Sequence, residues 1–204
     1  MSAPPPESLP RKPLALLACG ALAREVREIA ARRGWDADLY TVPALDHLSP
    51  KKLLADVERE LDEIAPRYER VVVAYGDCGT AGALDRMLAK HGAVRTAGPH
   101  CYEMYGGAEL AGESDERIGT FFLTDWLVRN WERAVVEGLG IGRFPFLKKT
   151  YFDHITDVLY LRQSPEPALE GKAREIADCL GVPIEIRDVG FGDLERRLID
   201  LVDQ

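Results

Sequence analysis

The sequence lacks any apolar run near the roughly 20 residues that a helix needs to cross a bilayer. Its first 13 residues, MSAPPPESLPRKP, also lack the apolar centre of a secretory signal. We therefore expect a cytoplasmic protein without membrane partners. Residues 1–13 are expected to form a disordered, proline-rich tail, and residues 14–204 a single folded domain.

Positive charge is in short supply. Lys and Arg total 26 against 34 Asp and Glu, which gives a formal net charge of -8 at pH 7. A protein that binds nucleic acid through its phosphates needs concentrated Lys and Arg. The charge balance therefore argues against a nucleic-acid partner, and we expect a small-molecule substrate.

Cysteine is scarce, with four residues in the chain. In a reducing cytoplasm, such cysteines are more often reduced, metal-bound or reactive than paired in disulfides. Cys179 lies inside a predicted helix, where a buried thiol behaves as a small apolar residue, and we expect it to be an inert core residue. The other three cysteines lie where predicted strands end.

What the sequence has in quantity is alternation between short apolar runs and segments with helical spacing. Residues 120–140 indicate a short extended piece that runs into a helix. Strands are predicted at residues 14–20, 36–43, 70–76, 93–98, 157–163 and 182–190, and helices at residues 21–34, 50–66, 80–92, 167–181 and 192–203. Alternation of this kind predicts an α/β protein with a Rossmann-like parallel sheet, right-handed crossovers and helices on both faces.

Three of the cysteines are expected to meet at one edge of this sheet. Cys19, Cys78 and Cys101 each follow a predicted strand, and parallel strands end at the same edge, where ligands bind. A helix begins after each of them, and its positive dipole end favours the thiolate. Nearby glycines permit tight turns and close approach of a metal or cofactor, so they are candidate cofactor-binding residues: Gly20, Gly76 and Gly79.

Three thiolates allow three kinds of chemistry. They could bind zinc, with His100, Glu103, water or substrate in the fourth position. They could hold an iron–sulfur cluster with one iron open to substrate. They could also act without a metal, as a nucleophile and its resolving partner. Soft sulfur ligands exclude magnesium and calcium, but they do not distinguish zinc from an iron–sulfur cluster.

Other polar residues near the predicted site are candidates for catalysis. Tyr75, His100 and Glu103 could hydrogen-bond a substrate or transfer a proton. His100 is adjacent to Cys101, and neighbouring residues rarely point at one ion, so a contact to substrate or to a ligand is the main expectation for it. The remaining polar side chains are expected to have structural roles: Glu25 as a surface charge, Asp77 as a cap, and His47, His91 and His154 as surface or capping residues. Trp126 is expected mainly to pack.

Four segments together resemble the DUF1638 family of uncharacterised prokaryotic proteins. They are ACGALAREV, VVVAYGDCGT, HCYEMYGG and GTFFLTDWL, and the resemblance extends over roughly residues 14–200. The family pattern usually carries a histidine two places before the third cysteine, where this chain has Pro99. The resemblance therefore supports a functional role for the three cysteines more firmly than it supports a histidine ligand. It implies association with corrinoid-dependent methyl transfer and one-carbon metabolism, with any corrinoid held by a partner protein.

Two main hypotheses about function follow. The first is a metal-dependent enzyme with a three-cysteine zinc or iron–sulfur site, acting on a small molecule of methyl-transfer, one-carbon or thiol metabolism. The second is a non-enzymatic accessory or metal-carrying protein that docks on a corrinoid protein or methyltransferase. A third is a binder of small anions through the N–H groups of the Cys-Gly turns. The residues alone leave open whether the chain is an enzyme.

Overall fold

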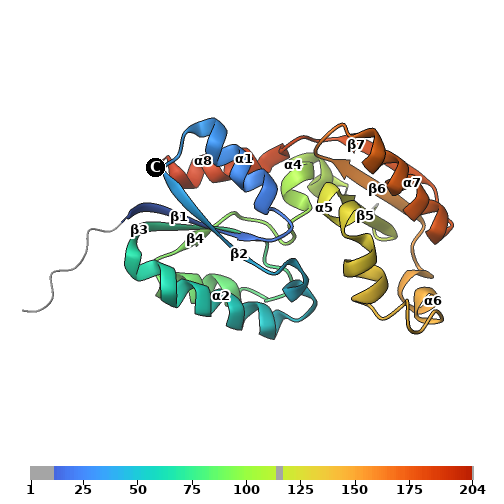
Figure 1. Cartoon of the computed structure of the whole chain (residues 1–204), viewed down its shortest axis with the longest axis horizontal. Coiled ribbons are helices and arrows are strands. Elements are labelled where there is room, and N and C mark those ends of the chain that lie inside the picture. Colours follow the sequence, from blue (N-terminus) through green and yellow to red (C-terminus); the bar gives the residue numbers. More distant parts are fainter. Residues whose placement is uncertain (1–11, 114–116, 204) are drawn as a thin grey trace, which may run out of the picture.

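The computed structural model describes residues 12–113 and 117–203. Its strands form two parallel sheets flanked by helices (Figure 1). The first sheet has the order β2-β1-β3-β4, with β1 at Lys12–Cys19, β2 at Ala37–Val42, β3 at Tyr68–Ala74 and β4 at Val94–Arg95. The second has the order β5-β6-β7, with β5 at Thr120–Thr124, β6 at Asp157–Arg162 and β7 at Ile184–Asp188. The prediction of an α/β fold with parallel strands is confirmed, and the structure adds that the strands divide between two sheets.

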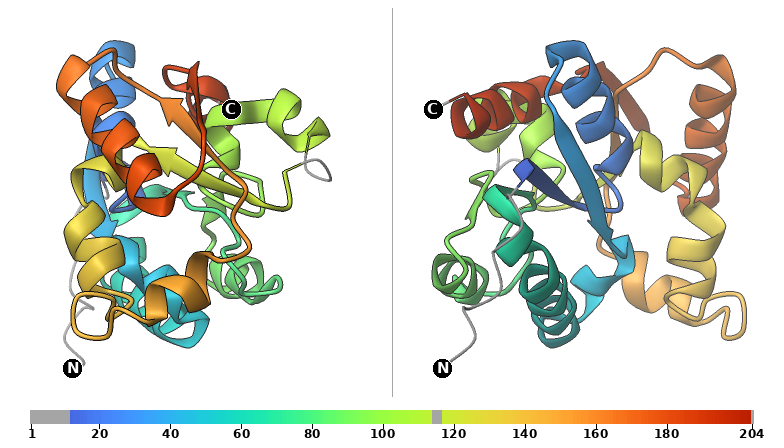
Figure 2. Two further views of the ribbon diagram at one scale, coloured as in Figure 1. Left: turned by 90° about the vertical axis from the view of Figure 1, so that its right-hand side faces the viewer. Right: turned by 60° about the vertical axis from the view of Figure 1, so that its left-hand side comes forward.

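Helices cover both faces of the first sheet. On one face lie α1 (Ala23–Arg33) and α8 (Gly192–Val202), and on the other lie α2 (Pro50–Ile64) and α3 (Ala83–Lys90) (Figures 1 and 2). In α2 the buried residues recur every three or four positions, at Leu53, Val57, Leu61 and Ile64. This spacing places them on one side of the helix, against the sheet.

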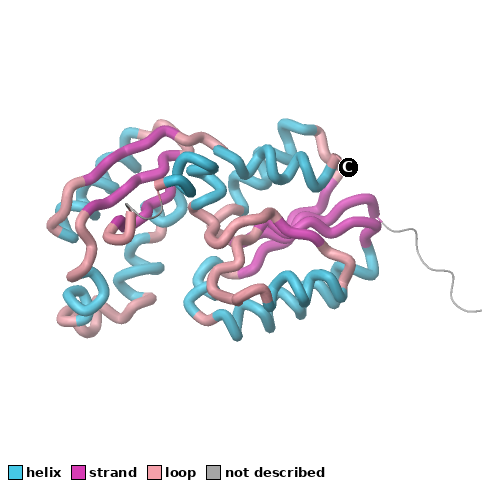
Figure 3. Tube along the Cα trace, turned by 180° about the vertical axis from the view of Figure 1, so that it is seen from behind, coloured by secondary structure: helices cyan, strands magenta, loops and turns pink. Residues whose placement is uncertain are grey.

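The last helix returns to the sheet on which the chain begins. Strand β7 belongs to the second sheet, but α8 buries Leu194 and Leu198 in the core of the first. The views from the front and from behind both show α8 beside the first sheet (Figures 1 and 3). The chain therefore passes from the first sheet to the second and then returns, so that the last helix packs against the sheet that contains the first strand.

The second sheet has a core of its own, which includes Val128, Trp131, Val158 and Ile176. Its helical cover consists of α5 (Asp125–Arg129), the π-helix η3 (Glu132–Glu137), α6 (Leu147–Phe152) and α7 (Pro167–Leu180). The extended piece predicted to run into a helix over residues 120–140 is present as β5 followed directly by α5.

Helix α7 corrects one prediction. It buries Leu169, Ala173, Ile176 and Ala177, whereas Cys179 is exposed. Two positions beyond Ala177, the side chain has rotated by about 200° around the helix, away from the core. The prediction that Cys179 is a core residue is therefore wrong.

Two expectations concern the ends of the chain and membranes. A proline-rich tail is predicted over residues 1–13, and residues 1–11 of it are outside the part of the chain that the structure describes. The remaining two residues, Lys12 and Pro13, belong to β1, which begins at Lys12. Within residues 12–113 and 117–203, no helix combines the length and the apolar character required to cross a membrane.

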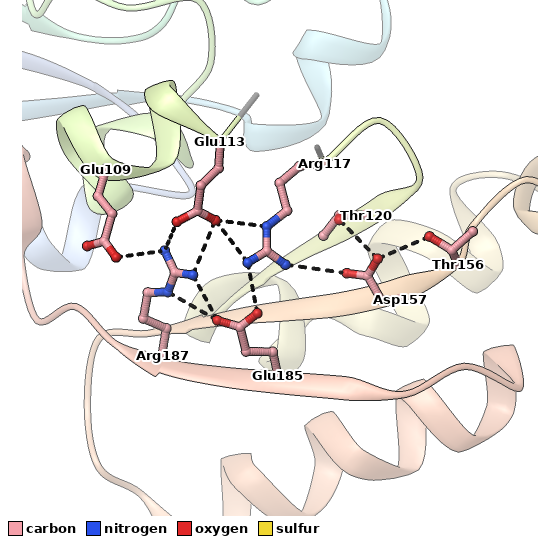
Figure 4. A network of polar contacts seen from close by, with 8 residues as sticks. All are labelled: Glu109, Glu113, Arg117, Thr120, Thr156, Asp157, Glu185 and Arg187. Carbon is pink, nitrogen blue, oxygen red and sulfur yellow. Dashed lines mark hydrogen bonds and ion pairs between the residues drawn. The ribbon is translucent and has the colours of Figure 1, made fainter. Parts of the chain in front are cut away.

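A network of ion pairs joins α4 (Glu103–Gly112) to the second sheet (Figure 4). Directly after α4, the Glu113 carboxylate accepts hydrogen bonds from Arg117 at 2.9 Å and from Arg187 of β7 at 3.0 Å. Glu185 of β7 accepts from both arginines, each at 2.8 Å. Single exposed pairs contribute little, but a network of partly buried arginines holds its geometry better. The network fixes α4 against the second sheet, and α4 begins beside the candidate site.

Candidate functional site

The three predicted thiols lie together at the carboxyl edge of the first sheet. Cys19 is the last residue of β1, Cys78 follows β3, and Cys101 precedes α4. The sulfur atoms of Cys78 and Cys101 are 3.9 Å apart, and Cys19 lines the same pocket as these two residues. All three are free thiols. Residues more than 80 positions apart in the sequence thus form one cluster, as the topology of a parallel sheet allows.

The loop after β3 brings Cys78 and Cys101 together. Backbone N–H groups of Asp77 and Cys78 donate to the carbonyl oxygens of Gly98 and Pro99, at 3.0 and 2.8 Å. Gly76 allows this contact, because a Cβ there would lie 2.8 Å from the carbonyl carbon of His100 and 3.0 Å from the backbone nitrogen of Cys101.

The other two candidate glycines also shape the backbone. Gly79 has a φ of +82°, a left-handed conformation that favours glycine. A Cβ on Gly20 would approach the Val42 carbonyl oxygen and the Ala44 nitrogen to 3.2 Å. Among the described residues, those that line the pocket next to the thiols do not include Gly20, Gly76 or Gly79.

The thiols share protons within the cluster. A hydrogen bond from Cys101 lowers the pKa of Cys78 to about 5, and a second bond from His100 adds to this effect. Hydrogen bonding by Cys101 also lowers the pKa of Cys19. The pKa of Cys101 itself is raised well above its usual value, because its S–H stabilises the two neighbouring thiolates. The cluster therefore favours the thiolate at Cys78.

A pocket of about 200 Å³ opens beside this cluster, between the two sheets. From the first sheet and its connections come Cys19, Ala21, Leu22, His47, Cys78, His100, Cys101, Tyr102 and Tyr105, and from the second come Phe122, Thr124, Trp126 and Leu127. Among the described residues that line it there is no Lys, Arg, Asp or Glu. Trp126, expected mainly to pack, is part of its wall.

Three stacked rings form one wall of the pocket. His100 stacks on Tyr102 with ring centres 5.1 Å apart, and Tyr102 stacks on Phe122 of β5 at 4.4 Å. A hydrogen bond to the Cys78 thiolate raises the pKa of His100, because the thiolate stabilises the imidazolium. The stack thus links the thiol cluster to the second sheet.

The three residues predicted to act in catalysis take different positions. Only His100 lines the pocket. Tyr75 is fully buried, and burial together with the nearby Cys19 and Cys101 raises its pKa. Glu103 pairs with Arg197 of α8 at 3.1 Å and lines a neighbouring depression that shares His100 and Tyr102 with the thiol-lined pocket.

Asp77 and His91 both have structural roles, although Asp77 binds the turn before α3 and its side chain does not cap the helix itself. The Asp77 carboxylate accepts from the backbone N–H groups of Ala81 and Gly82, both at 2.9 Å. One ring nitrogen of His91 lies 3.1 Å from the Met87 carbonyl oxygen and the other lies 3.0 Å from Asp62. His47 bonds the Ala44 carbonyl oxygen, as a capping residue does, but it also lines the pocket. Nothing local in the sequence signals that second role, since it depends on how residues 44–48 fold over the sheet edge.

Glu25 is not the surface charge that the sequence predicts. It lies one turn into α1 and is 4% exposed, and its Oε2 atom has no hydrogen-bond partner among the described residues. Burial is the main reason that its pKa is raised, and a hydrogen bond with Tyr105 acts in the opposite direction. The helical spacing places Glu25 next to Leu22 and Val26, and this was the one available signal that it faces inward.

Replacing Glu25 with glutamine is expected to change the pH dependence of stability. A raised carboxyl pKa means that the native state favours the protonated form, so the stabilisation is complete below the unfolded pKa and is lost as pH rises through the folded pKa. The variant and the natural protein should therefore be equally stable near pH 4, and the variant more stable at pH 8. The difference amounts to about 1.4 kcal/mol for each unit by which burial raises the pKa. Urea unfolding across this range measures it, and a constant difference would contradict the assignment.

The thiol cluster has the chemistry of a site for a soft metal. Among the described residues, however, no group of three or more His, Cys, Asp or Glu side chains has an arrangement that could hold a metal ion. Two sulfurs bound to one tetrahedral zinc at about 2.3 Å lie about 3.8 Å apart. The Cys78 and Cys101 sulfurs are 3.9 Å apart. Cys78 and Cys101 could thus bind one ion, and Cys19, which lines the same pocket, is the candidate third ligand.

The fold and this pocket together define an α/β protein with a thiol-lined cavity between two parallel sheets. The profile of the family described as "Protein of unknown function (DUF1638)" matches residues 42–198, and the chain belongs to this family. The match includes Cys78 and Cys101 and begins after Cys19. No curated protein and no solved structure matches the chain.

Proposed function

We propose that the chain is a metal-dependent enzyme in which Cys19, Cys78 and Cys101 bind one soft ion, and that the adjoining pocket takes a small sulfur- or methyl-bearing molecule. The observation that supports this most directly is the meeting of three distant thiols beside one cavity. Isolated structural cysteines have no reason to gather at a pocket, whereas ligands of one ion must do so.

Zinc is the ion that the geometry favours. In a [4Fe–4S] cluster each thiolate binds a different iron, so the ligand sulfurs are spread farther apart than two ligands of a single ion. The 3.9 Å between Cys78 and Cys101 corresponds to two ligands of one tetrahedral ion. A zinc ion at this position would keep the sulfur of a bound thiol deprotonated and nucleophilic at neutral pH.

The pocket lining indicates which substrates would fit. Its volume of about 200 Å³ corresponds to roughly seven water molecules at about 30 Å³ each, so it suits a molecule of a few heavy atoms. Without Lys or Arg in its lining, the pocket offers little to a phosphate or a carboxylate, which disfavours the reading as an anion binder. The stacked rings of His100, Tyr102 and Phe122 would exclude water from the thiolates, and His100 would keep Cys78 ionised.

A second candidate is an accessory protein that carries the ion to a corrinoid protein or methyltransferase. It is supported by Phe146, which is 69% exposed beside the exposed Phe144, because large apolar side chains at a surface often mark contacts with partners. Co-purification from the native host with such a partner would favour this candidate, and isolation of a lone, catalytically competent protein would exclude it.

Metal analysis tests the proposed site. Protein purified without oxygen is expected to contain about one zinc per chain, and Cys78→Ser or Cys101→Ser should remove most of it because serine is a poor ligand for a soft ion. Cys179→Ser is the matched control, since that thiol is exposed and outside the cluster, and should keep its zinc. A protein that contains no metal and cannot be loaded with one would refute the site. Equal amounts of iron and sulfide in the protein would instead identify the site as an iron–sulfur cluster.

A further inference from the structure

We propose that Cys78 and Cys101 form a redox-active pair, which exchanges with a small uncharged disulfide in the pocket and becomes an intramolecular disulfide. This inference goes beyond the proposed function, because the exchange requires two adjacent thiols and no metal ion. In a reducing compartment such a disulfide is transient, and it serves catalysis or redox sensing.

The two sulfur atoms already lie side by side. They are 3.9 Å apart, and both cysteines are free, half-buried and part of the pocket lining. A disulfide requires about 2.05 Å between its sulfurs, so rotations of the two side chains have a short gap to close. A disulfide that enters the pocket and reacts with one of these thiols therefore has the second thiol directly beside it.

The backbone holds the pair in this position. Cys78 has a φ of +46°, a left-handed conformation that residues other than glycine rarely adopt, and its N–H donates to the Pro99 carbonyl oxygen at 2.8 Å. Gly76 lets the second segment approach, since a Cβ there would lie 3.0 Å from the Cys101 nitrogen. A residue in a rare backbone conformation persists only where its surroundings fix it, and such residues concentrate at functional sites.

The other two cysteines are outside the pair. Cys19 is 2% exposed, and its register with Val42 of β2 fixes its backbone within the sheet. A thiol must be accessible to react with a dissolved disulfide, so Cys19 is expected to stay reduced. Cys179 is exposed on α7, and among the described residues those that line the pocket do not include it. It can therefore serve as an internal reference for reactivity outside the pocket.

The pocket lining selects the kind of disulfide. The cavity of about 200 Å³ has no Lys, Arg, Asp or Glu among the described residues that line it, and Tyr102, Phe122 and Trp126 contribute aromatic surface. The carboxylates of a large charged reagent, glutathione disulfide, would find no cation there, and an uncompensated charge is costly to bury. A small neutral reagent, 2-hydroxyethyl disulfide, avoids this cost.

The exchange balances in two steps. One sulfur of the pair attacks the small disulfide as a thiolate, so that a mixed disulfide forms, the S–S bond of the reagent breaks, and the first small thiolate leaves with the proton that the cysteine lost. The other cysteine then attacks the cysteine sulfur of the mixed disulfide and displaces the second small thiolate, which takes the second proton. Two cysteine thiols are oxidised by two electrons in total, and one small disulfide is reduced to two thiols.

Peptide mapping by mass spectrometry tests the pair. The full-length reduced protein is incubated without oxygen with 2-hydroxyethyl disulfide, in a chelator that keeps the sulfurs free of metal. The natural protein is expected to form the Cys78–Cys101 disulfide and to keep no adduct on either residue. Cys78→Ser and Cys101→Ser should instead keep a mixed disulfide on the cysteine that remains, because the second thiol is absent. Cys19→Ser is the control and should form the disulfide as the natural protein does.

The selectivity of the pocket is measured against Cys179. The rate with 2-hydroxyethyl disulfide divided by the rate with glutathione disulfide should be at least about tenfold larger for the pair than for Cys179, because the pocket has no cation to compensate a carboxylate. Equal ratios would show that the exchange does not take place in the pocket.

The outcomes separate this inference from the proposed function. Adducts on Cys78 or Cys101 of the natural protein without a disulfide between them, or no reaction at either residue, would overturn the pair. Loss of the disulfide in Cys19→Ser would also overturn it as a unit of two thiols. The metal content measured before the chelator is added tests the proposed function by itself. A Cys19→Ser protein that lacks zinc but still forms the disulfide would establish the pair as separate from the metal site.

Discussion

Alanine at Gly76 is expected to destabilise the protein and to disrupt the thiol cluster. The new Cβ would lie 2.8 and 2.9 Å from the carbonyl carbon and Cα of His100 and 3.0 Å from the Cys101 nitrogen. All three are backbone atoms, so no side-chain rotation relieves the contact, and residues 100 and 101 must shift. Overpacking of this kind costs about 1 to 3 kcal/mol. The shift also moves the Cys101 sulfur away from Cys78.

Two measurements check this result. Urea unfolding reports the loss of stability, and cobalt titration reports the affinity of the thiol cluster, which should fall by at least about tenfold because ligand positions are displaced. Gly171→Ala is the matched control, since a Cβ on this exposed glycine of α7 meets no atom within 4 Å. It should stabilise the protein by about 0.5 to 1 kcal/mol, as alanine in a helix does. Unchanged metal affinity in Gly76→Ala would show that the close approach of the two segments does not position the sulfurs.

Asp125→Ala is expected to cost about 3 to 5 kcal/mol, a large part of the 5–15 kcal/mol that usually stabilises a protein. Its carboxylate accepts from the Tyr160 hydroxyl and from the backbone nitrogens of Gln163 and Ser164. Alanine leaves these three donors buried without partners, and each such group is costly. The acid also connects the ends of β5 and β6, so the second sheet should loosen where it faces the pocket.

The size of the effect can be apportioned with a second variant. Tyr160→Phe removes one of the three donors and leaves Asp125 with its two backbone partners. It should cost only about 1 kcal/mol. Equilibrium unfolding of both variants measures the contrast. Equal losses would show that the tyrosine contact alone accounts for the role of Asp125.

The elements of the fold were largely predictable, because each leaves a local pattern. The apolar run at residues 70–76 and the spacing of Leu53, Val57, Leu61 and Ile64 predict β3 and α2, and the structure has both. The three thiols could also be predicted to share an edge, since parallel strands end on one side. Cys179 was misplaced because one helical turn offers both buried and exposed positions, and only the neighbouring elements decide between them.

The pocket itself could not be read from the sequence. Its second wall, with Phe122 and Trp126, comes from a separate sheet, and no local pattern indicates where one sheet ends and the next begins. The same holds for Glu25, which looks like an ordinary helical charge until α4 and α5 pack over it.

The sequence by itself determined which segments become strands and helices and which residues could ligate a soft ion, because spacing and side-chain chemistry are properties of the chain alone. The tertiary structure decided that the strands form two sheets, that the Cys78 and Cys101 sulfurs lie 3.9 Å apart, and that an acid on α1 is buried. Those features depend on contacts between residues far apart in the chain, and such contacts exist only once the two sheets have packed.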